Sequence, residues 1–148
     1  MNNISKISYF IVDKFKSNVL VNTIAYEKTT EMDFNKENIY PLVNVDIIES
    51  TILNNLITID YTITIVEARD IEPVMNADKL FGTNMIDNLN ETHTIAVKFI
   101  NEISKQQNDL NIDVVQVTSI QFLKLDKGAL DGVRFTITIS TPNNISSC

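Results

Sequence analysis

The sequence contains few of the residues on which catalysis and metal binding usually depend. Among its 148 residues are one histidine (His93), one cysteine (Cys148) and three glycines. A single cysteine excludes an internal disulfide and a multi-cysteine metal site, and a Cys–His pair would need Cys148, at the end of the chain, which no rigid element positions. Without GxGxxG or GxxxxGK[ST] spacing the chain also lacks a phosphate-cradling loop. We therefore expect no catalytic residue, no cofactor and no metal, and the protein is not expected to be an enzyme.

Positive charge is also scarce. The only arginines are Arg69 and Arg134, and the net charge is −7, which argues against a phosphate-binding surface. Six acidic residues against Arg69 make residues 39–72 the most acidic part of the chain. Such an excess is usually a solvated face. Direct binding of nucleic acid is not expected.

Long apolar runs are absent as well. No segment approaches the roughly 18 apolar residues of a transmembrane helix, and the amino terminus has lysines and an aspartate inside its apolar stretch, unlike a signal peptide. We expect a soluble protein with no membrane contact. The length fits one domain, residues 1–148, with one hydrophobic core.

The clearest pattern in the chain is the alternation in LITIDYTITIV, residues 56–66. Isoleucines and a tyrosine fall on one side of an extended chain, and threonines and an aspartate fall on the other. This period of two, in a run of β-branched residues, predicts a long strand with one buried face. The candidate core residues of this strand are Ile57, Ile59, Tyr61, Ile63 and Ile65.

The elements before this strand are predicted from spacing and turn residues. Residues 4–19 read as an amphipathic helix with a stripe that includes Ile4 and Val19. Residues 20–26 could form a short strand, and residues 27–38 form a long polar connection. A strand within residues 39–49 would pair with the long strand as a β-hairpin, and Asn54-Asn55 suits the turn.

After the long strand, residues 67–84 form a second long connection, followed by a helix. Asn84 or Asn88 could cap this helix, and Asn88-x-x-Glu91 resembles a capping box. Its apolar stripe consists of Leu89, His93, Ala96, Ile100 and Ile103, widened by Ile95 and Phe99. His93 is interpreted as a residue at the boundary of the core. The candidate core residues on this helix are Leu89, Ala96, Ile100 and Ile103.

The chain then returns to strands. Residues 112–125 alternate with a change of phase near Ser119, which a β-bulge would explain. Residues 133–140 alternate cleanly, the loop 126–132 joins the two strands as a hairpin, and the tail 142–148 is expected to be loose. The predicted fold class is α+β, an antiparallel sheet built from two hairpins with helices packed on one face. The helix after Asn88 is expected to cover the isoleucine face.

Paired acids are the remaining candidates for chemistry. Asp46 and Asp60 could approach each other across the first hairpin and bind a divalent cation or act as a carboxylate dyad. No histidine, aromatic platform or oriented cation accompanies them in the sequence, so a structural interpretation is favoured.

The order of elements resembles a family of viral proteins. A first amphipathic helix, a polar loop, the strand start Ile39-Tyr40-Pro41-Leu42-Val43, a Thr/Ile-rich long strand, a helix near Asn88 and a last hairpin at 112–140 are similar to the tail-terminator or tail-completion proteins of tailed bacteriophages. The resemblance covers roughly residues 4 to 141 and is one of architecture. The connection 67–84 is longer than usual for the family, and the net charge is markedly acidic.

The resemblance implies a structural subunit of the head–tail neck or tail ring. Such subunits form a homo-oligomeric ring, with a hexamer favoured and a dodecamer possible, contact neck, portal or tail proteins, and let DNA pass without binding it specifically. The implied location is the virion, with the host cytoplasm during assembly. On this interpretation the acids Asp46, Asp60, Glu49 and Glu67 are candidates for residues that face the channel, although they could instead solubilise an outer surface. The alternative function is a small cytoplasmic, non-enzymatic binding or regulatory module.

Overall fold

The computed structural model describes residues 3–31, 39–69, 84–125 and 130–143. The elements of these ranges, in chain order, are α1 (Asn3–Lys16), β1 (Thr23–Ala25), the 3-10 helix η1 (Thr29–Glu31), β2 (Leu42–Leu53), β3 (Leu56–Ala68), α2 (Met85–Lys105), α3 (Gln107–Leu110), β4 (Asp113–Val117), β5 (Gln121–Leu125) and β6 (Leu130–Pro142). The predicted connections 27–38 and 67–84, the hairpin loop 126–132 and the tail 142–148 lie partly outside the described residues.

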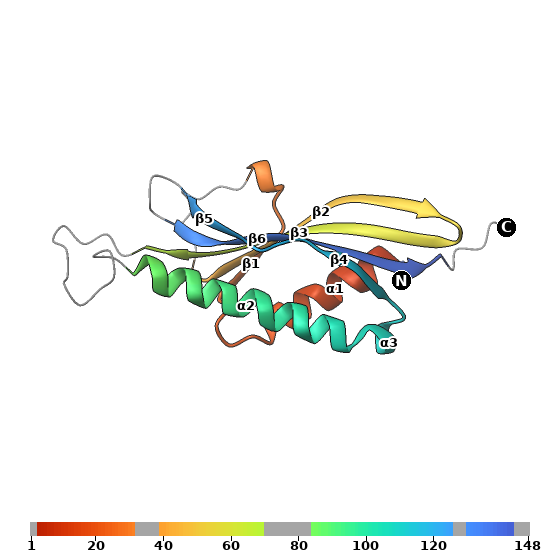
Figure 1. Cartoon of the computed structure of the whole chain (residues 1–148), viewed down its shortest axis with the longest axis horizontal. Coiled ribbons are helices and arrows are strands. Elements are labelled where there is room, and N and C mark those ends of the chain that lie inside the picture. Colours follow the sequence, from red (N-terminus) through yellow and green to blue (C-terminus); the bar gives the residue numbers. More distant parts are fainter. Residues whose placement is uncertain (1–2, 32–38, 70–83, 126–129, 144–148) are drawn as a thin grey trace.

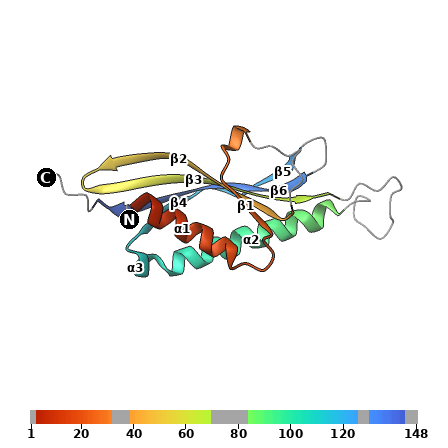
Figure 2. The ribbon, with the colours of Figure 1, turned by 180° about the vertical axis from the view of Figure 1, so that it is seen from behind.

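A mostly antiparallel sheet forms the centre of the fold (Figure 1). In the described part of the chain it has six strands in the order β1-β2-β3-β6-β4, and β5 also pairs with β6. The strand β1 runs parallel to β2. Both long helices lie on one face of the sheet, whereas η1 lies on the other, as the view from behind also shows (Figure 2). The predicted α+β class with a mostly antiparallel sheet is confirmed.

The strands β2 and β3 form a long antiparallel ladder closed by a two-residue turn. Asn54 and Asn55 occupy this turn with φ of 51° and 64°. Two positive φ angles give the backbone the twist that a tight hairpin needs, and asparagine tolerates this region better than most residues. The register shifts between Ile47 and Glu49, so a β-bulge, absent from the sequence prediction, lies in β2.

The strands β4, β5 and β6 do not form the simple second hairpin that was expected. Two separate strands, β4 and β5, pair with the two halves of β6. Between them Thr118 keeps contact with Thr136: the Thr118 amide donates to the Thr136 carbonyl at 2.9 Å, and the Thr136 amide donates to Thr118 Oγ1 at 2.8 Å. The register shift falls between Val114 and Gln116, whereas a shift near Ser119 was expected. With β1 added in parallel, the sheet is more than two hairpins.

The hydrophobic core lies between the sheet and the two long helices. Odd-numbered residues of β3 and β6 pack in it together with α1 and α2. The rings of Phe15 and Phe99 stack at 4.4 Å between centroids, and the Tyr61 hydroxyl lies 3.0 Å from Ser8 Oγ. The candidate core residues that are buried are Ile57, Ile59, Tyr61, Ile63, Ile65, Ala96 and Ile103. Leu89 and Ile100 are only partly buried.

The buried stripe of α2 contains part of the predicted stripe together with two polar residues that were not predicted. Its buried residues are Asn88, Thr92, Ile95, Ala96, Phe99 and Ile103. Of the predicted stripe, Ile95, Ala96, Phe99 and Ile103 are buried. Leu89, His93 and Ile100 are only partly buried. The predicted capping box is also wrong, because α2 begins at Met85 and Asn88 lies within it. The prediction missed Asn88 and Thr92 because a hydrophobic pattern does not mark buried polar residues.

The predicted first helix is too long at its C-terminal end. It ends at Lys16, and Val19 is 92% exposed. The side chain of Asn18 accepts a hydrogen bond from the Leu20 amide at 3.0 Å. Asparagine in this geometry favours a turn over a further helical residue, so the apolar stripe stops at Phe15.

The first prediction concerns the central isoleucine face. Ile63 is fully buried between β2, β6 and the helices, so Ile63→Ala should lower the free energy of unfolding by about 2 to 5 kcal/mol. Denaturant titration measures this loss. Val97→Ala on the outer side of α2, where Val97 is 37% exposed, is the control and should change little. A loss for Ile63→Ala as small as that of the control would contradict the assigned facing of β3.

Candidate functional site

The sheet face opposite the helices carries a row of polar side chains. Cross-strand pairing places Asp46, Thr62 and Thr136 opposite one another on β2, β3 and β6. The next row joins Thr64 to Arg134. Since side chains alternate along a strand, these residues point away from the core that the odd-numbered residues of β3 form. The predicted polar face of the hairpin therefore continues across β6.

One wall of this face is the segment that follows β1. The amide and the hydroxyl of Thr29 both donate to Asp46 Oδ2 at 2.7 Å. The side chain of Asn44 pairs with the backbone of Glu27, accepting from its amide and donating to its carbonyl at 2.8 Å each. These bonds attach η1 to the helix-free face, where Figure 1 shows it. The polar connection predicted after residue 26 is thus partly a structured wall.

The opposite wall is the interruption between β4 and β5. Together the walls enclose an open groove of about 590 Å³. We call it the threonine groove. Its polar lining includes Thr29, Asp46, Thr62, Thr118, Arg134 and Thr136, and Lys28, Ile47, Ile48 and Phe135 line it as well. Its floor is polar, with the hydroxyls of Thr62 and Thr136 only 3.1 Å apart.

In the described part of the chain, Arg134 is one of two cations that line the groove, and the other is the exposed Lys28. The Nε of Arg134 donates to Thr64 Oγ1 at 3.0 Å, and its side chain is partly buried. Burial lowers the pKa of the guanidinium from its ordinary value, because removal of water disfavours the charged form. Arginine nevertheless stays protonated at neutral pH. Among the described residues, no carboxylate forms an ion pair with Arg134.

The four candidate acids are divided between the two faces of the sheet. Asp46 faces the threonine groove. Glu49 of β2 lies opposite Asp60 of β3 in the strand register, farther along the same face. Glu67 follows the odd-numbered phase of β3 and lies opposite Asp131 on the helix side. The structure thus brings three of these acids to one face and separates Glu67 from them.

These acids have different surroundings. Asp46 holds η1 through Thr29, and Asp60 Oδ1 accepts a hydrogen bond from the Thr138 hydroxyl at 2.7 Å. Glu49 is exposed. Within the described ranges no group of three or more His, Cys, Asp or Glu side chains could hold a metal ion. The pair Asp46 and Asp60 is therefore accounted for by hydrogen bonds to threonines.

The single histidine lies at the edge of the core. His93 is partly buried on α2, and its ring stacks on Phe122 of β5 with 5.8 Å between centroids. Together with Ile86 and Leu89 these rings line a small apolar hollow. Cys148 lies outside the described residues.

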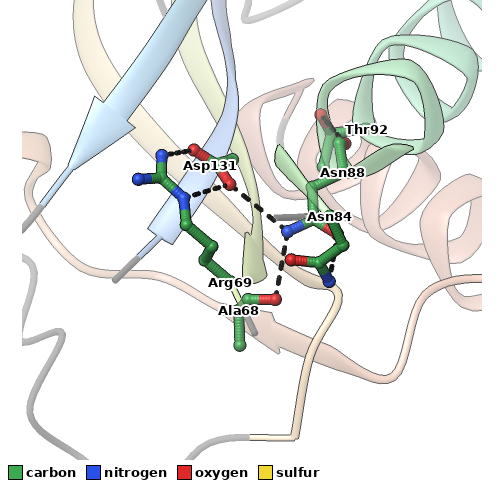
Figure 3. A network of polar contacts seen from close by, with 6 residues as sticks. All are labelled: Ala68, Arg69, Asn84, Asn88, Thr92 and Asp131. Atoms are coloured by element: carbon green, nitrogen blue, oxygen red, sulfur yellow. Dashed lines mark hydrogen bonds and ion pairs between the residues drawn. The ribbon is translucent and has the colours of Figure 1, made fainter. Parts of the chain in front are cut away.

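A buried ionic network joins β3, β6 and α2 (Figure 3). Asp131 is fully buried and forms a two-point ion pair with Arg69, whose Nε lies 2.9 Å from Asp131 Oδ2. The side-chain Nδ2 of Asn88 donates to Ala68 O at 3.0 Å and to Asp131 Oδ2 at 3.3 Å. The hydrogen bond to Asp131 raises the pKa of Arg69. The network fastens the end of β3 and the start of α2 to β6.

This network was not predicted from the sequence. Asp131 belonged to the predicted loop 126–132, and Asn88 was predicted to cap the helix. Both side chains are buried in the folded chain. The two arginines were the available signal for such sites. Arg69 binds Asp131, and Arg134 donates to Thr64 on the other face of the sheet.

The second prediction tests this network. Arg69→Met would leave the buried Asp131 carboxylate without its cation, so the free energy of unfolding should fall by about 3 to 5 kcal/mol. Adding Asp131→Asn should restore part of the loss, because the uncompensated charge is removed. Lys98→Met, an exposed cation of α2, is the matched control for denaturant titration. A small loss in Arg69→Met, or no recovery in the double variant, would contradict the buried ion pair.

Comparison with known proteins does not identify a family. No protein-family model matches the sequence, and a search of curated proteins finds no significant match. None of the helices in the described ranges is long and apolar enough to cross a membrane.

Proposed function

We propose that the chain is a structural subunit of a bacteriophage head–tail neck or tail ring, similar to tail-terminator or tail-completion proteins, that joins virion proteins around the DNA channel. The observation that carries this proposal is the outer half of the β2–β3 hairpin. Five large apolar side chains are between 44% and 67% exposed there, namely Ile47, Ile48, Ile52, Leu53 and Leu56. A lone subunit leaves this surface in water, whereas a neighbouring chain would bury it.

The sheet edges support the same proposal. β1 pairs only with residues 42–44 of β2, so within the described residues the rest of β2 has one edge without a neighbouring strand. β4 forms the opposite end of the sheet. Unpaired edge strands are templates for pairing with another chain. If the β2 edge of one subunit meets the β4 edge of the next, the contact is heterologous and can close into a ring.

The third prediction concerns assembly. Lysine substitutions at Ile52 and Leu53 should leave the monomer folded, because both side chains are 67% exposed, and should abolish ring formation. Analytical ultracentrifugation and negative-stain microscopy of the purified chain measure the assembly. Val19→Lys is the matched control, since Val19 is an exposed apolar residue away from the hairpin.

We expect rings, hexameric in the favoured case and dodecameric in the other, from the unmodified chain and from Val19→Lys. Rings that persist in the hairpin variant would contradict the role of the hairpin. An unmodified chain that stays monomeric at the highest concentration reached, also when mixed with the neck or tail proteins encoded beside it, would contradict the ring itself.

The acids of the helix-free face fit a channel that lets DNA slide. A wall that attracted phosphates would retain the genome, because each neutralised phosphate adds salt-dependent affinity. Glu49 is the best probe, since it is exposed, whereas Asp46 and Asp60 also hold neighbouring threonines. A purely solubilising role for these acids on an outer surface is the alternative.

The fourth prediction separates these two roles. In a phage that carries this gene, Glu49→Lys should yield complete particles whose DNA packaging or ejection is slowed at low salt and recovers as salt is raised. Asp109→Lys on α3, an exposed acid on the helix side, is the control with the same change of charge. Equal infectivity of the two variants at low salt would exclude Glu49 from the channel wall.

The threonine groove favours a second candidate function. A small cytoplasmic, non-enzymatic binding or regulatory module would use a polar groove on its sheet to hold a ligand, and such a module needs no ring. The assembly measurement above also separates this function from the first.

A further inference from the structure

The guanidinium of Arg134 is the feature of the threonine groove that the fold itself leaves unexplained. A partly buried cation ordinarily has a carboxylate partner, because burial without one costs free energy. In the described ranges Arg134 has only the neutral hydroxyl of Thr64 at Nε. Its terminal nitrogens remain as donors toward the groove that Arg134 lines. Their geometry matches the two oxygens of a carboxylate.

The charge of the groove selects among anions. Asp46 lies on the same floor, two strands and one row of side chains away, which corresponds to about 12 Å between the Cα atoms. The exposed side chain of Lys28 also lines the groove, so a polyanion such as nucleic acid would meet two cations but also this carboxylate. A ligand with one negative group and hydrogen-bond donors farther along would suit the groove, because the negative group would bind Arg134 and the donors would reach Asp46.

The size of the groove points to a short peptide. Its volume of about 590 Å³ lies within the usual range of ligand sites. About four extended residues span 12 Å at roughly 3.3 Å per residue. The hydroxyls of Thr62 and Thr136 between the two charged groups can donate to or accept from a peptide backbone.

We propose that the threonine groove binds a short extended peptide segment of a protein partner, with one aspartate or glutamate carboxylate of that segment held by Arg134. Backbone amides of the segment donate to Asp46 and to the threonine hydroxyls of the floor. This inference does not depend on ring assembly, and it applies equally to a virion neighbour and to a regulatory partner.

The site is tested by titrating the ¹⁵N-labelled full chain with a peptide and monitoring the chain by NMR. The probe is the peptide Ac-Thr-Thr-Glu-Thr-NH2, and the matched probe is the same peptide with glutamine in place of glutamate. We expect saturable shifts of the Arg134 Nε–H signal and of the Thr62 and Thr136 amides with the glutamate peptide. The glutamine peptide should bind at least about tenfold more weakly, a difference of roughly 1.4 kcal/mol.

Variants of the groove give the second comparison. Arg134→Gln should lower the affinity for the glutamate peptide to that for the glutamine peptide. Arg134→Lys should have an intermediate affinity, because a point charge replaces a planar guanidinium. Lys98→Gln, which removes an exposed cation from α2, should bind like the unmodified chain. If Arg134→Gln does not fold, the comparison of the two peptides on the unmodified chain still decides the proposal.

Three results would overturn the proposal. The first is equal binding of the glutamate and glutamine peptides, which would remove the role of the carboxylate. The second is the absence of groove shifts with the glutamate peptide. The third is binding of inorganic phosphate or acetate as tight as that of the peptide, which would make the groove a site for small anions.

Discussion

The fold depends on the burial of one face of β3. This strand lies between β2 and β6, and its odd-numbered side chains from Ile57 to Ile65 are almost fully removed from water. Burial of such a face is the main favourable contribution to folding, and the helices are the elements that provide it. Because α1 and α2 both pack on this side (Figure 2), the opposite face of the sheet is left free for polar side chains and for η1. The threonine groove is a direct consequence of that division.

Polar side chains add specific links between elements on both faces of the sheet. Asp131 and Arg69 join β6 to the end of β3, and Asn88 connects this pair to α2 (Figure 3). On the other face, Asp46 holds Thr29. In both places a carboxylate on a strand of the sheet accepts hydrogen bonds from a neighbouring segment of the chain. Charged groups thus specify where these segments lie, while the core supplies most of the stability.

Two surfaces have no structural role within the described residues, and they suggest different partners. The exposed apolar side chains around Ile52 and Leu53 suit a broad contact with another chain, as in a ring. Arg134 suits a single anionic group in a confined polar groove. The two surfaces meet at Ile47 and Ile48, which line the groove and are also exposed apolar side chains of the hairpin. Ile52, Leu53 and Leu56 lie beyond the groove, beside the hairpin turn.

The sequence by itself determined the elements whose pattern is local. The alternation of β3, the apolar periodicity of α2 and the Asn54-Asn55 turn each depend on neighbours within a few residues, so they could be read directly. Of the candidate site, the sequence indicated that Asp46 and Asp60 share a polar face, because both belong to one hairpin. It did not indicate that Glu67 lies on the other face, nor that Asn88 and Thr92 are interior residues of α2.

Only the tertiary structure decided the rest. The parallel addition of β1, the interruption between β4 and β5, the Asp131 network and the position of Arg134 opposite Thr64 all join segments that are distant in the chain. Arg134 and Thr64 are 70 positions apart. A local hydrophobic pattern reports that one face of an element is buried, but it does not report which partner buries it or in which register. A polar residue in the interior is invisible to that pattern, because its burial depends on a partner that only the folded chain brings within hydrogen-bonding distance.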